Sequence, residues 1–207
     1  MTRLIYDKKS DTVKTLIGLD NAFLPLVERV GAITVEIHDN HYVSLASTII
    51  AQQVSSKVAM IMTGRFLSFF GSDPDPAKVV KTPDEDMRAL GLSKQKIRYL
   101  KSLSSHVLEG SLDFSRMAGM EDHDVIAMLT KVTGIGTWTA EMFLIFSLAR
   151  EDVFSIGDLG LRNGVRKLYG DPDLSDSDIL ELSRRWHPVR SVASHYLWHI
   201  WDYQVEV

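Results

Sequence analysis

The chain has 207 residues, of which 45% are hydrophobic and 24% charged, and it carries a formal net charge of −4. This composition is typical of a folded globular protein and argues against intrinsic disorder. The sequence contains no cysteine, which excludes disulfides, thiolate zinc sites, cysteine nucleophiles and cysteine-held iron–sulfur clusters.

The first ten residues are polar and charged, and no apolar run approaches the roughly 20 residues that cross a bilayer. We therefore expect a chain without signal peptide or membrane segment, located in the cytoplasm or nucleoid of a bacterium or archaeon, or in a eukaryotic nucleus. The negative net charge argues mildly against a nucleic-acid partner. Basic residues nevertheless gather in three stretches, namely Lys94, Lys96, Arg98 and Lys101, then Arg162, Arg166 and Lys167, then Arg184, Arg185 and Arg190.

Apolar residues recur at helical spacing through most of the chain. The first clear helix lies between Asp20, a plausible N-cap, and Gly31, which ends it. Residues 32–37 are the only strand-like stretch. A long apolar segment over residues 43–70 follows, and Gly71 closes it. The pattern thus predicts an almost entirely helical protein.

Two adjacent amides, Gln52 and Gln53, interrupt that apolar segment. Amides inside an apolar helix cost desolvation energy unless they are exposed or hydrogen-bonded. Either the helix breaks here and presents a polar tip, or the pair forms a satisfied buried network. The spacing alone does not separate these two readings.

A short glycine turn joins two later helices. Leu129 ends the apolar stripe of one helix, Thr133-Gly134-Ile135-Gly136 follows, and Thr137 can cap the next helix. The glycines permit positive φ and let a phosphate approach the backbone, while the helix N-terminus points N–H groups at it. A tight turn without any ligand is the plain alternative for Gly-x-Gly. The flanking apolar positions favour the phosphate-binding hairpin.

Asp158 stands between the apolar residues 153–156 and a helix that Gly170 ends. Aspartate in this place is commonly a simple N-cap. A capping carboxylate can also face a cleft, so the two roles are compatible.

These motifs in combination resemble helix-hairpin-helix DNA glycosylases, and most closely the 3-methyladenine DNA glycosylase II (AlkA/Mag-like) branch. The segments that carry the resemblance are Ile49-Ile-Ala-Gln-Gln-Val-Ser55, Gly91-Leu-Ser-Lys-Gln-Lys-Ile-Arg-Tyr-Leu100, Leu129-Thr-Lys-Val-Thr-Gly-Ile-Gly136, Asp158-Leu-Gly-Leu-Arg-Asn-Gly164 and Leu197-Trp-His-Ile-Trp201. The likeness runs from about Leu16 to Trp201. Bifunctional family members carry a lysine nucleophile two residues after the last glycine of the hairpin, where this chain has Trp138.

The resemblance implies an all-α fold with two helical lobes and a DNA-binding cleft between them, the whole of 1–207 forming one catalytic unit. One lobe would span 42–152, with the hairpin at 122–149, and the other would combine 1–41 with 153–207. The expected partner is double-stranded DNA containing alkylated bases, and the chain is expected to be a monomer. No cofactor is expected beyond a structural Na⁺ or K⁺ at the hairpin, and no iron–sulfur cluster.

The resemblance also implies roles for individual residues. Asp158 would be catalytic, and the base pocket would hold Trp138, Trp201 and Met142. Gln53 and Val54 would form the wedge that fills the vacated base stack. The DNA backbone would be bound by Gly134, Ile135, Gly136, Thr137, Trp138, Lys94, Lys96 and Arg162. The monovalent cation would be held by the backbone carbonyls of Thr130, Val132 and Gly134.

The expected function is that of a monofunctional glycosylase without lyase activity, which excises alkylated purines such as 3-methyladenine and 7-methylguanine in base excision repair. One alternative is a non-catalytic helix-hairpin-helix DNA-binding module, which would not need Asp158. Another is a glycosylase for a different base lesion, against which Trp138 and the Gln-Gln-x-Ser segment argue. A helical protein–protein adaptor is a further alternative, favoured only by the negative net charge.

Overall fold

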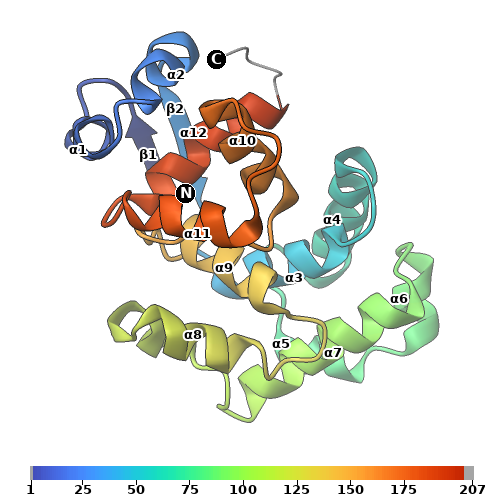
Figure 1. Ribbon diagram of the computed structural model, residues 1–207. Helices are drawn as coiled ribbons and strands as arrows, with labels where there is room; N and C mark the ends of the chain where they lie inside the picture. Colours follow the sequence, from blue (N-terminus) through green and yellow to red (C-terminus); the bar gives the residue numbers. More distant parts are fainter. Residues whose placement is uncertain (1, 203–207) are drawn as a thin grey trace. The chain divides into compact units, whose positions relative to one another are not determined.

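The computed structural model describes residues 2–202, with side chains for residues 2–200, and the chain forms two compact units (Figure 1). Residues His38–Phe143 make up what we call the central unit. The described residues up to Ile37 and from Leu144 onward make up the terminal unit. One boundary falls inside the helix α9 (Thr137–Phe146), which therefore belongs to both units.

The terminal unit contains a two-stranded antiparallel sheet, in which β1 (Thr2–Tyr6) pairs with β2 (Ile33–Ile37). In β2 the side chains are alternately buried and exposed, as expected of a strand with one face on the core. The sequence pattern predicted this strand but not β1. In β1 only Tyr6 is buried, so its sequence lacks the alternation that reveals a strand, and pairing with β2 defines it instead.

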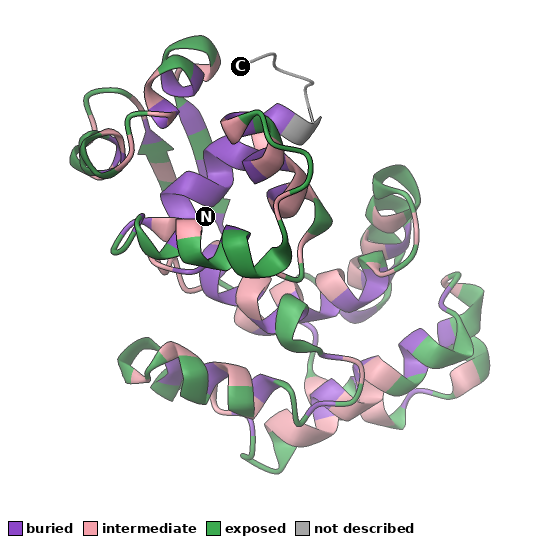
Figure 2. Ribbon diagram, viewed as in Figure 1, coloured by how far each residue is buried: buried purple, intermediate pink, exposed green. Residues whose placement is uncertain are grey.

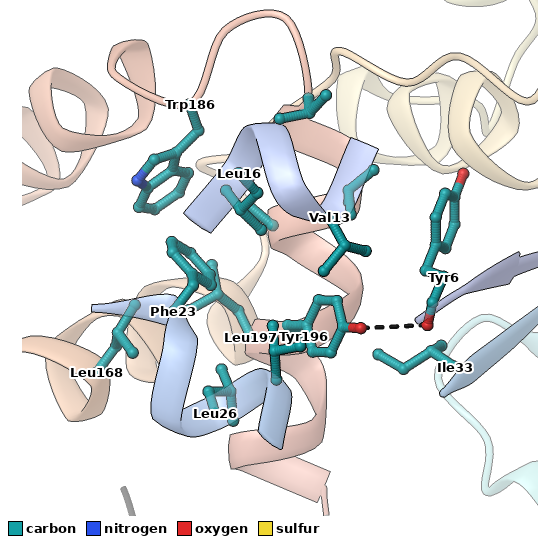
Figure 3. Packing of buried hydrophobic residues seen from close by; sticks show 14 of the residues in the cluster. Tyr6, Val13, Leu16, Phe23, Leu26, Ile33, Leu168, Trp186, Tyr196 and Leu197 are labelled. Carbon is teal, nitrogen blue, oxygen red and sulfur yellow. Dashed lines mark hydrogen bonds between the residues drawn. The ribbon is translucent and has the colours of Figure 1, made fainter. Parts of the chain in front are cut away.

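Five helices complete the described part of the terminal unit beside the end of α9: α1 (Asp11–Leu19), α2 (Phe23–Val30), α10 (Leu159–Tyr169), α11 (Asp176–Arg184) and α12 (Arg190–Asp202). Helix α12 packs against α1, α2 and α10, and it is buried along most of its length (Figure 2). Its Tyr196 hydroxyl donates a hydrogen bond to the carbonyl oxygen of Tyr6 at 3.1 Å (Figure 3). Residues distant in sequence thus share one core.

Asp20 occupies a different position from the predicted N-cap. Helix α2 begins at Phe23 after Ala22, which provides no side-chain cap. The Asp20 carboxylate instead accepts hydrogen bonds from the Trp186 indole at 3.1 Å and from the Tyr169 hydroxyl. This acid ties the start of the chain to the C-terminal helices, which local sequence cannot show.

The central unit is built from α-helices and one 3₁₀ helix in addition to the start of α9. They are α3 (His41–Ala51), α4 (Ser56–Phe70), α5 (Pro76–Lys81), α6 (Asp84–Ala89), α7 (Lys94–Leu108), η1 (Phe114–Gly119) and α8 (Asp122–Leu129). Helix α7 packs against α3, α5 and α6. A buried hydrogen bond of 2.7 Å between the Tyr42 hydroxyl and Ser104 joins α3 to α7.

Helices therefore dominate both units, which confirms the predicted helical fold apart from the small sheet. Among the described residues, no helix combines the length and the apolar character that crossing a bilayer would require.

Candidate DNA-binding and catalytic site

Helices α8 and α9 form a hairpin around the glycine turn. Ile135 is buried in the turn, and its N–H donates to the carbonyl of Val132 at 3.0 Å. Gly136 and Thr137 are exposed, and α9 begins at Thr137. The turn thus anchors one apolar side chain inward and presents its glycine-rich backbone and the start of a helix outward, as an anion-binding hairpin requires.

Gly134 cannot be replaced by a larger residue without rearrangement. Its φ is +94°, and a Cβ added to it would lie 2.2 Å from Cγ of Tyr99 on α7. The adjacent Thr133 N–H donates to the hydroxyl of Ser102, also on α7, at 3.1 Å. The tyrosine ring and the serine hydroxyl together seat the hairpin turn on α7.

The break between α3 and α4 presents a polar tip. Helix α3 ends at Ala51, and α4 begins at Ser56 after Ser55, whose hydroxyl accepts from the Val58 N–H. Gln53 lies in the break, is exposed, and has a φ of +58°. A left-handed conformation is uncommon for a residue other than glycine and is often found at functional positions.

Gln52, next to this tip in the sequence, belongs to a hydrogen-bonded network. Its Nε2 donates to the carbonyl oxygen of Gly134 at 2.9 Å, and its own carbonyl accepts from Lys96 Nζ at 2.8 Å. Lys96 Nζ also donates to the carbonyl of Ile50. The sequence left open a polar tip or a satisfied network, and the structure contains both, with Gln53 at the tip and Gln52 in the network.

Lys96 is buried, with only 8% of its surface exposed. Burial lowers the pKa of its ammonium group. Lys96 was predicted to bind the DNA backbone, but its ammonium is instead held by the carbonyl oxygens of Ile50 and Gln52 at the end of α3. Alternation of basic residues along the sequence does not reveal which of them points inward.

A pocket of about 360 Å³ opens beside the break, lined by Thr48, Ala51, Gln52, Gln53 and Trp138. Trp138 is in the first turn of α9 and is 42% exposed, which is a large exposed fraction for tryptophan. Met142 follows one turn later on the same helix and is half-buried. The pocket therefore combines an aromatic face with amide side chains, a suitable lining for a planar base.

In the terminal unit, Asp158 is the N-cap of α10, as the sequence predicted. Its Oδ1 accepts the Leu161 N–H at 2.8 Å and the Trp198 indole N–H at 3.1 Å. The side chain is half-buried. The carboxylate is thus held by two donors while part of its surface stays accessible.

The model of the HhH-GPD superfamily of base excision DNA repair proteins matches residues 46–188. The chain belongs to this superfamily. The match spans the break between α3 and α4, the hairpin and Asp158, and it confirms the resemblance drawn from the motifs.

Known members of the superfamily are similar over most of this chain. The crystal structure of a DNA-3-methyladenine glycosidase from Bacillus halodurans is 37% identical, with a TM-score of 0.88 over 96% of this chain and 93% of that one. The structure of the Schizosaccharomyces pombe 3-methyladenine DNA glycosylase in complex with abasic DNA is 33% identical, with a TM-score of 0.80 over 92% and 96% of the two chains. The DNA-3-methyladenine glycosylase of Saccharomyces cerevisiae is 32% identical over 79% of this chain, which spans 58% of that protein's length.

The basic residues predicted to bind DNA in this HhH-GPD protein lie in different environments. Lys94, at the start of α7, is exposed, as is Arg98. Arg162 is half-buried: its Nη1 donates to the carbonyl of Ile156 at 2.7 Å, and its Nε lies 3.7 Å from Asp176 Oδ1. Lys94 therefore has the more accessible charge of the two.

Trp201 and the carbonyls predicted to hold a cation were the remaining site predictions for this HhH-GPD chain. Trp201 lies in α12, but its side chain falls outside the described part of the structure. Of the three carbonyls predicted to hold a cation, those of Val132 and Gly134 each accept a hydrogen bond within the central unit. A carbonyl has two lone pairs, so these bonds are compatible with a cation, and the site stays a prediction.

The sequence indicated no role for Tyr99 or Trp198, and it did not indicate that Lys96 is buried. Tyr99 and Trp198 stand inside segments that carry the superfamily resemblance, at 91–100 and 197–201. Their position as aromatic residues inside these motifs was the one feature of the sequence that could have indicated a role. Only the structure shows that one seats Gly134 and the other contacts Asp158.

Proposed function

We propose that this protein is a monofunctional DNA glycosylase that flips alkylated purines out of duplex DNA and hydrolyses their N-glycosidic bonds. The observation that carries the proposal is the Asp158 carboxylate, held at the start of α10 by the Leu161 and Trp198 N–H groups. Membership of a base excision repair superfamily supports the reaction class. The relatives named as 3-methyladenine glycosylases support alkylated purines as substrates.

The reaction needs a stabilising negative charge more than a strong acid. Alkylation at N3 or N7 makes the purine cationic, so it leaves readily with the electron pair of the glycosidic bond. The sugar then develops oxocarbenium character, as in glycoside hydrolysis. Asp158 stabilises that positive charge and orients a water molecule, which adds to the anomeric carbon and loses a proton to the carboxylate or to solvent.

Trp138 supports both a base pocket and the absence of lyase activity. Its exposed indole lines the pocket beside the break between α3 and α4. An electron-rich ring attracts a cationic base by about 0.5–2 kcal/mol, which favours alkylated purines without selecting strongly among them. By the family resemblance, Met142 and Trp201 would contact the same flipped base. Tryptophan has no amine, so it cannot form the imine through which a lyase cleaves the strand.

Gln53, with Val54 beside it, is the proposed wedge. Flipping a nucleotide leaves a gap in the base stack worth a few kcal/mol, and an inserted side chain replaces part of the lost contact. Gln53 is exposed in the break, and the residue before it, Gln52, is fixed by its hydrogen bond to Gly134. A fixed neighbouring residue suits a side chain that must enter the stack.

The hairpin backbone is the proposed phosphate-binding element. The N–H groups from Gly134 to Trp138 would contact the DNA backbone, with a Na⁺ or K⁺ ion on the carbonyls of Thr130, Val132 and Gly134. Such an ion would add positive charge where phosphates approach. Lys94 adds attraction that is independent of base sequence.

Release of free bases from methylated DNA tests this proposal. The purified chain is incubated with methylated duplex DNA, the released bases are separated by chromatography, and the DNA is probed for alkali-labile sites. We expect 3-methyladenine and 7-methylguanine to be released, with strand breaks only after alkali and no imine trapped by borohydride. Binding without base release would indicate the non-catalytic DNA-binding module. Release only from a duplex with oxidised or mismatched bases would indicate another lesion.

A further inference from the structure

The break between α3 and α4 contains a tight turn of a recognisable type. Gln52 has a φ of −54° and a ψ of 130°, and Gln53 has a φ of +58°. The N–H of Val54 donates to the carbonyl oxygen of Ala51 at 3.4 Å. These angles and this hydrogen bond match a type II β-turn over residues 51–54. Such a turn normally carries glycine or asparagine where this chain has Gln53, so a contact from outside the turn must favour it.

The competing conformation is a type I turn, which suits most residues. There the ψ of the second residue is about −30° and the φ of the third is about −90°. Relative to those values, the peptide group between Gln52 and Gln53 is rotated by about half a turn, so the Gln52 carbonyl points to the opposite side of the chain. The direction of this carbonyl distinguishes the two turns, and it sets the φ of Gln53 and the direction of the Gln53 side chain.

The ammonium of Lys96, on α7, binds this carbonyl in its type II direction. Its Nζ donates to the carbonyl oxygen of Gln52 at 2.8 Å and also to that of Ile50 in the last turn of α3. Lys96 is buried. A type I turn would direct the Gln52 carbonyl away and take an acceptor from a buried charged donor, which costs more than the loss of a bond between neutral groups.

We propose that Lys96 is a positioning residue for the wedge, whose ammonium selects the type II turn and so directs Gln53 towards the base stack. This inference rests on the proposed function, in which Gln53 enters the stack. A side chain that is oriented before DNA binds loses less conformational freedom when it inserts. Lys96 acts through the turn and contacts neither the flipped base nor the reacting atoms.

Lys96→Met tests the inference, because methionine has nearly the length of lysine but no donor. Single-turnover release of 7-methylguanine from duplex DNA, with the protein in excess, is expected to fall about ten- to a hundredfold, the scale of a hydrogen bond from a charged group. Release from single-stranded DNA is expected to stay near the wild-type rate, because no stack has to be refilled there. A wild-type rate on duplex DNA, or equal losses on both substrates, would overturn the inference.

Lys96→Arg is the rescue variant. Its guanidinium keeps the charge and several donors, and a pocket of about 420 Å³, lined by Lys96, Gln52 and Gln53 among others, gives the longer side chain room. Most of the duplex activity should be retained, and a rate as low as that of Lys96→Met would overturn the inference. If Lys96→Met does not fold, Lys96→Gln replaces it, since this side chain is neutral and one bond shorter, and the same loss confined to duplex DNA is expected.

The chain offers a matched control in Tyr42. Its hydroxyl forms a buried hydrogen bond of 2.7 Å with Ser104, which joins the same two helices, α3 and α7, but at the start of α3. Tyr42→Phe should lower the melting temperature and leave the ratio of duplex to single-strand release unchanged. A ratio that falls as far as in Lys96→Met would mean that any weakening between α3 and α7 slows duplex release, and it would overturn the inference.

A double-mutant cycle connects Lys96 to the wedge itself. In the Gln53→Ala background, Lys96→Met is expected to cause little further loss on duplex DNA, because the side chain that the turn directs is gone. Losses that multiply would overturn the inference. Failure of the wild type to release any base would overturn the proposed function and this inference together, whereas normal duplex release by both wild type and Lys96→Met overturns the inference alone.

Discussion

Gln52 donates a hydrogen bond from its side-chain Nε2 to the carbonyl oxygen of Gly134, 2.9 Å away. The bond joins the break between α3 and α4 to the turn of the hairpin, across 82 positions of the sequence. Lys96 extends the connection, since its ammonium binds the Gln52 carbonyl at 2.8 Å. The residue next to the proposed wedge is therefore hydrogen-bonded to the proposed phosphate-binding turn.

Gln52→Met tests that connection. Methionine keeps the length of the side chain but cannot donate to Gly134, so the unfolding free energy should fall by about 1 kcal/mol. Gln53→Met is the matched control, because the neighbouring side chain is exposed and should tolerate the change. Denaturant unfolding of both variants measures the difference, and equal stabilities would show that the hydrogen bond from Gln52 to Gly134 contributes nothing.

Gly134→Ala should destabilise the protein, whereas Gly136→Ala should not. A methyl group on Gly134 collides with the Tyr99 ring at a φ of +94°, but one on Gly136 meets no atom within 4 Å. Gly136→Ala should nevertheless weaken DNA binding, because its Cβ would stand where a phosphate approaches the exposed turn. Thermal melts and binding titrations provide the two readouts. A stable Gly134→Ala protein would contradict the described turn.

Gln53→Ala should impair excision from duplex DNA more than from single-stranded DNA. A wedge is useful only where a base stack must be refilled, and a single strand has no such stack to maintain. Rates of base release from a methylated oligonucleotide, alone and annealed to its complement, measure the effect. Equal losses on both substrates would assign Gln53 a structural role.

Acid should weaken the terminal unit through His195. Burial, with a smaller contribution from His199, lowers the pKa of His195 from 6.5 to about 4. Between these two pH values the unfolded chain binds a proton that the folded chain does not. The contribution of His195 to the free energy of unfolding is therefore complete above pH 6.5 and falls by up to about 3 kcal/mol as the pH approaches 4. His195→Gln should flatten the pH dependence of the unfolding free energy over this range. An unchanged slope would show that other groups cause it.

Local patterns in the sequence predicted much of the fold, because helices reveal themselves through apolar spacing and glycine stops. The strand β2, the hairpin turn and the N-cap at Asp158 were all recognisable in this way. Features that depend on distant residues were not. Strand β1 is defined by its partner, and Asp20 binds side chains about 150 positions away.

The candidate site shows the same division. The motifs identified Gln52, Gln53, Gly134 and Asp158, since each interrupts a local pattern. Lys96 was grouped with the residues that bind the DNA backbone, because a lysine within a basic run normally faces solvent, whereas tertiary packing directs this one to the end of α3. Trp198 had a place in a motif but no role until its hydrogen bond to Asp158 was seen.

Asp158→Asn tests the central claim most directly. Asparagine and aspartate are about equal as N-caps, so the fold and DNA affinity should change little. The variant loses the negative charge that the transition state requires, which typically costs about a hundred- to a thousandfold in rate. Single-turnover release of alkylated purines from methylated duplex DNA should therefore fall by that factor, least for the most labile cationic bases. Release at the wild-type rate would contradict the catalytic assignment and leave Asp158 with its capping role alone.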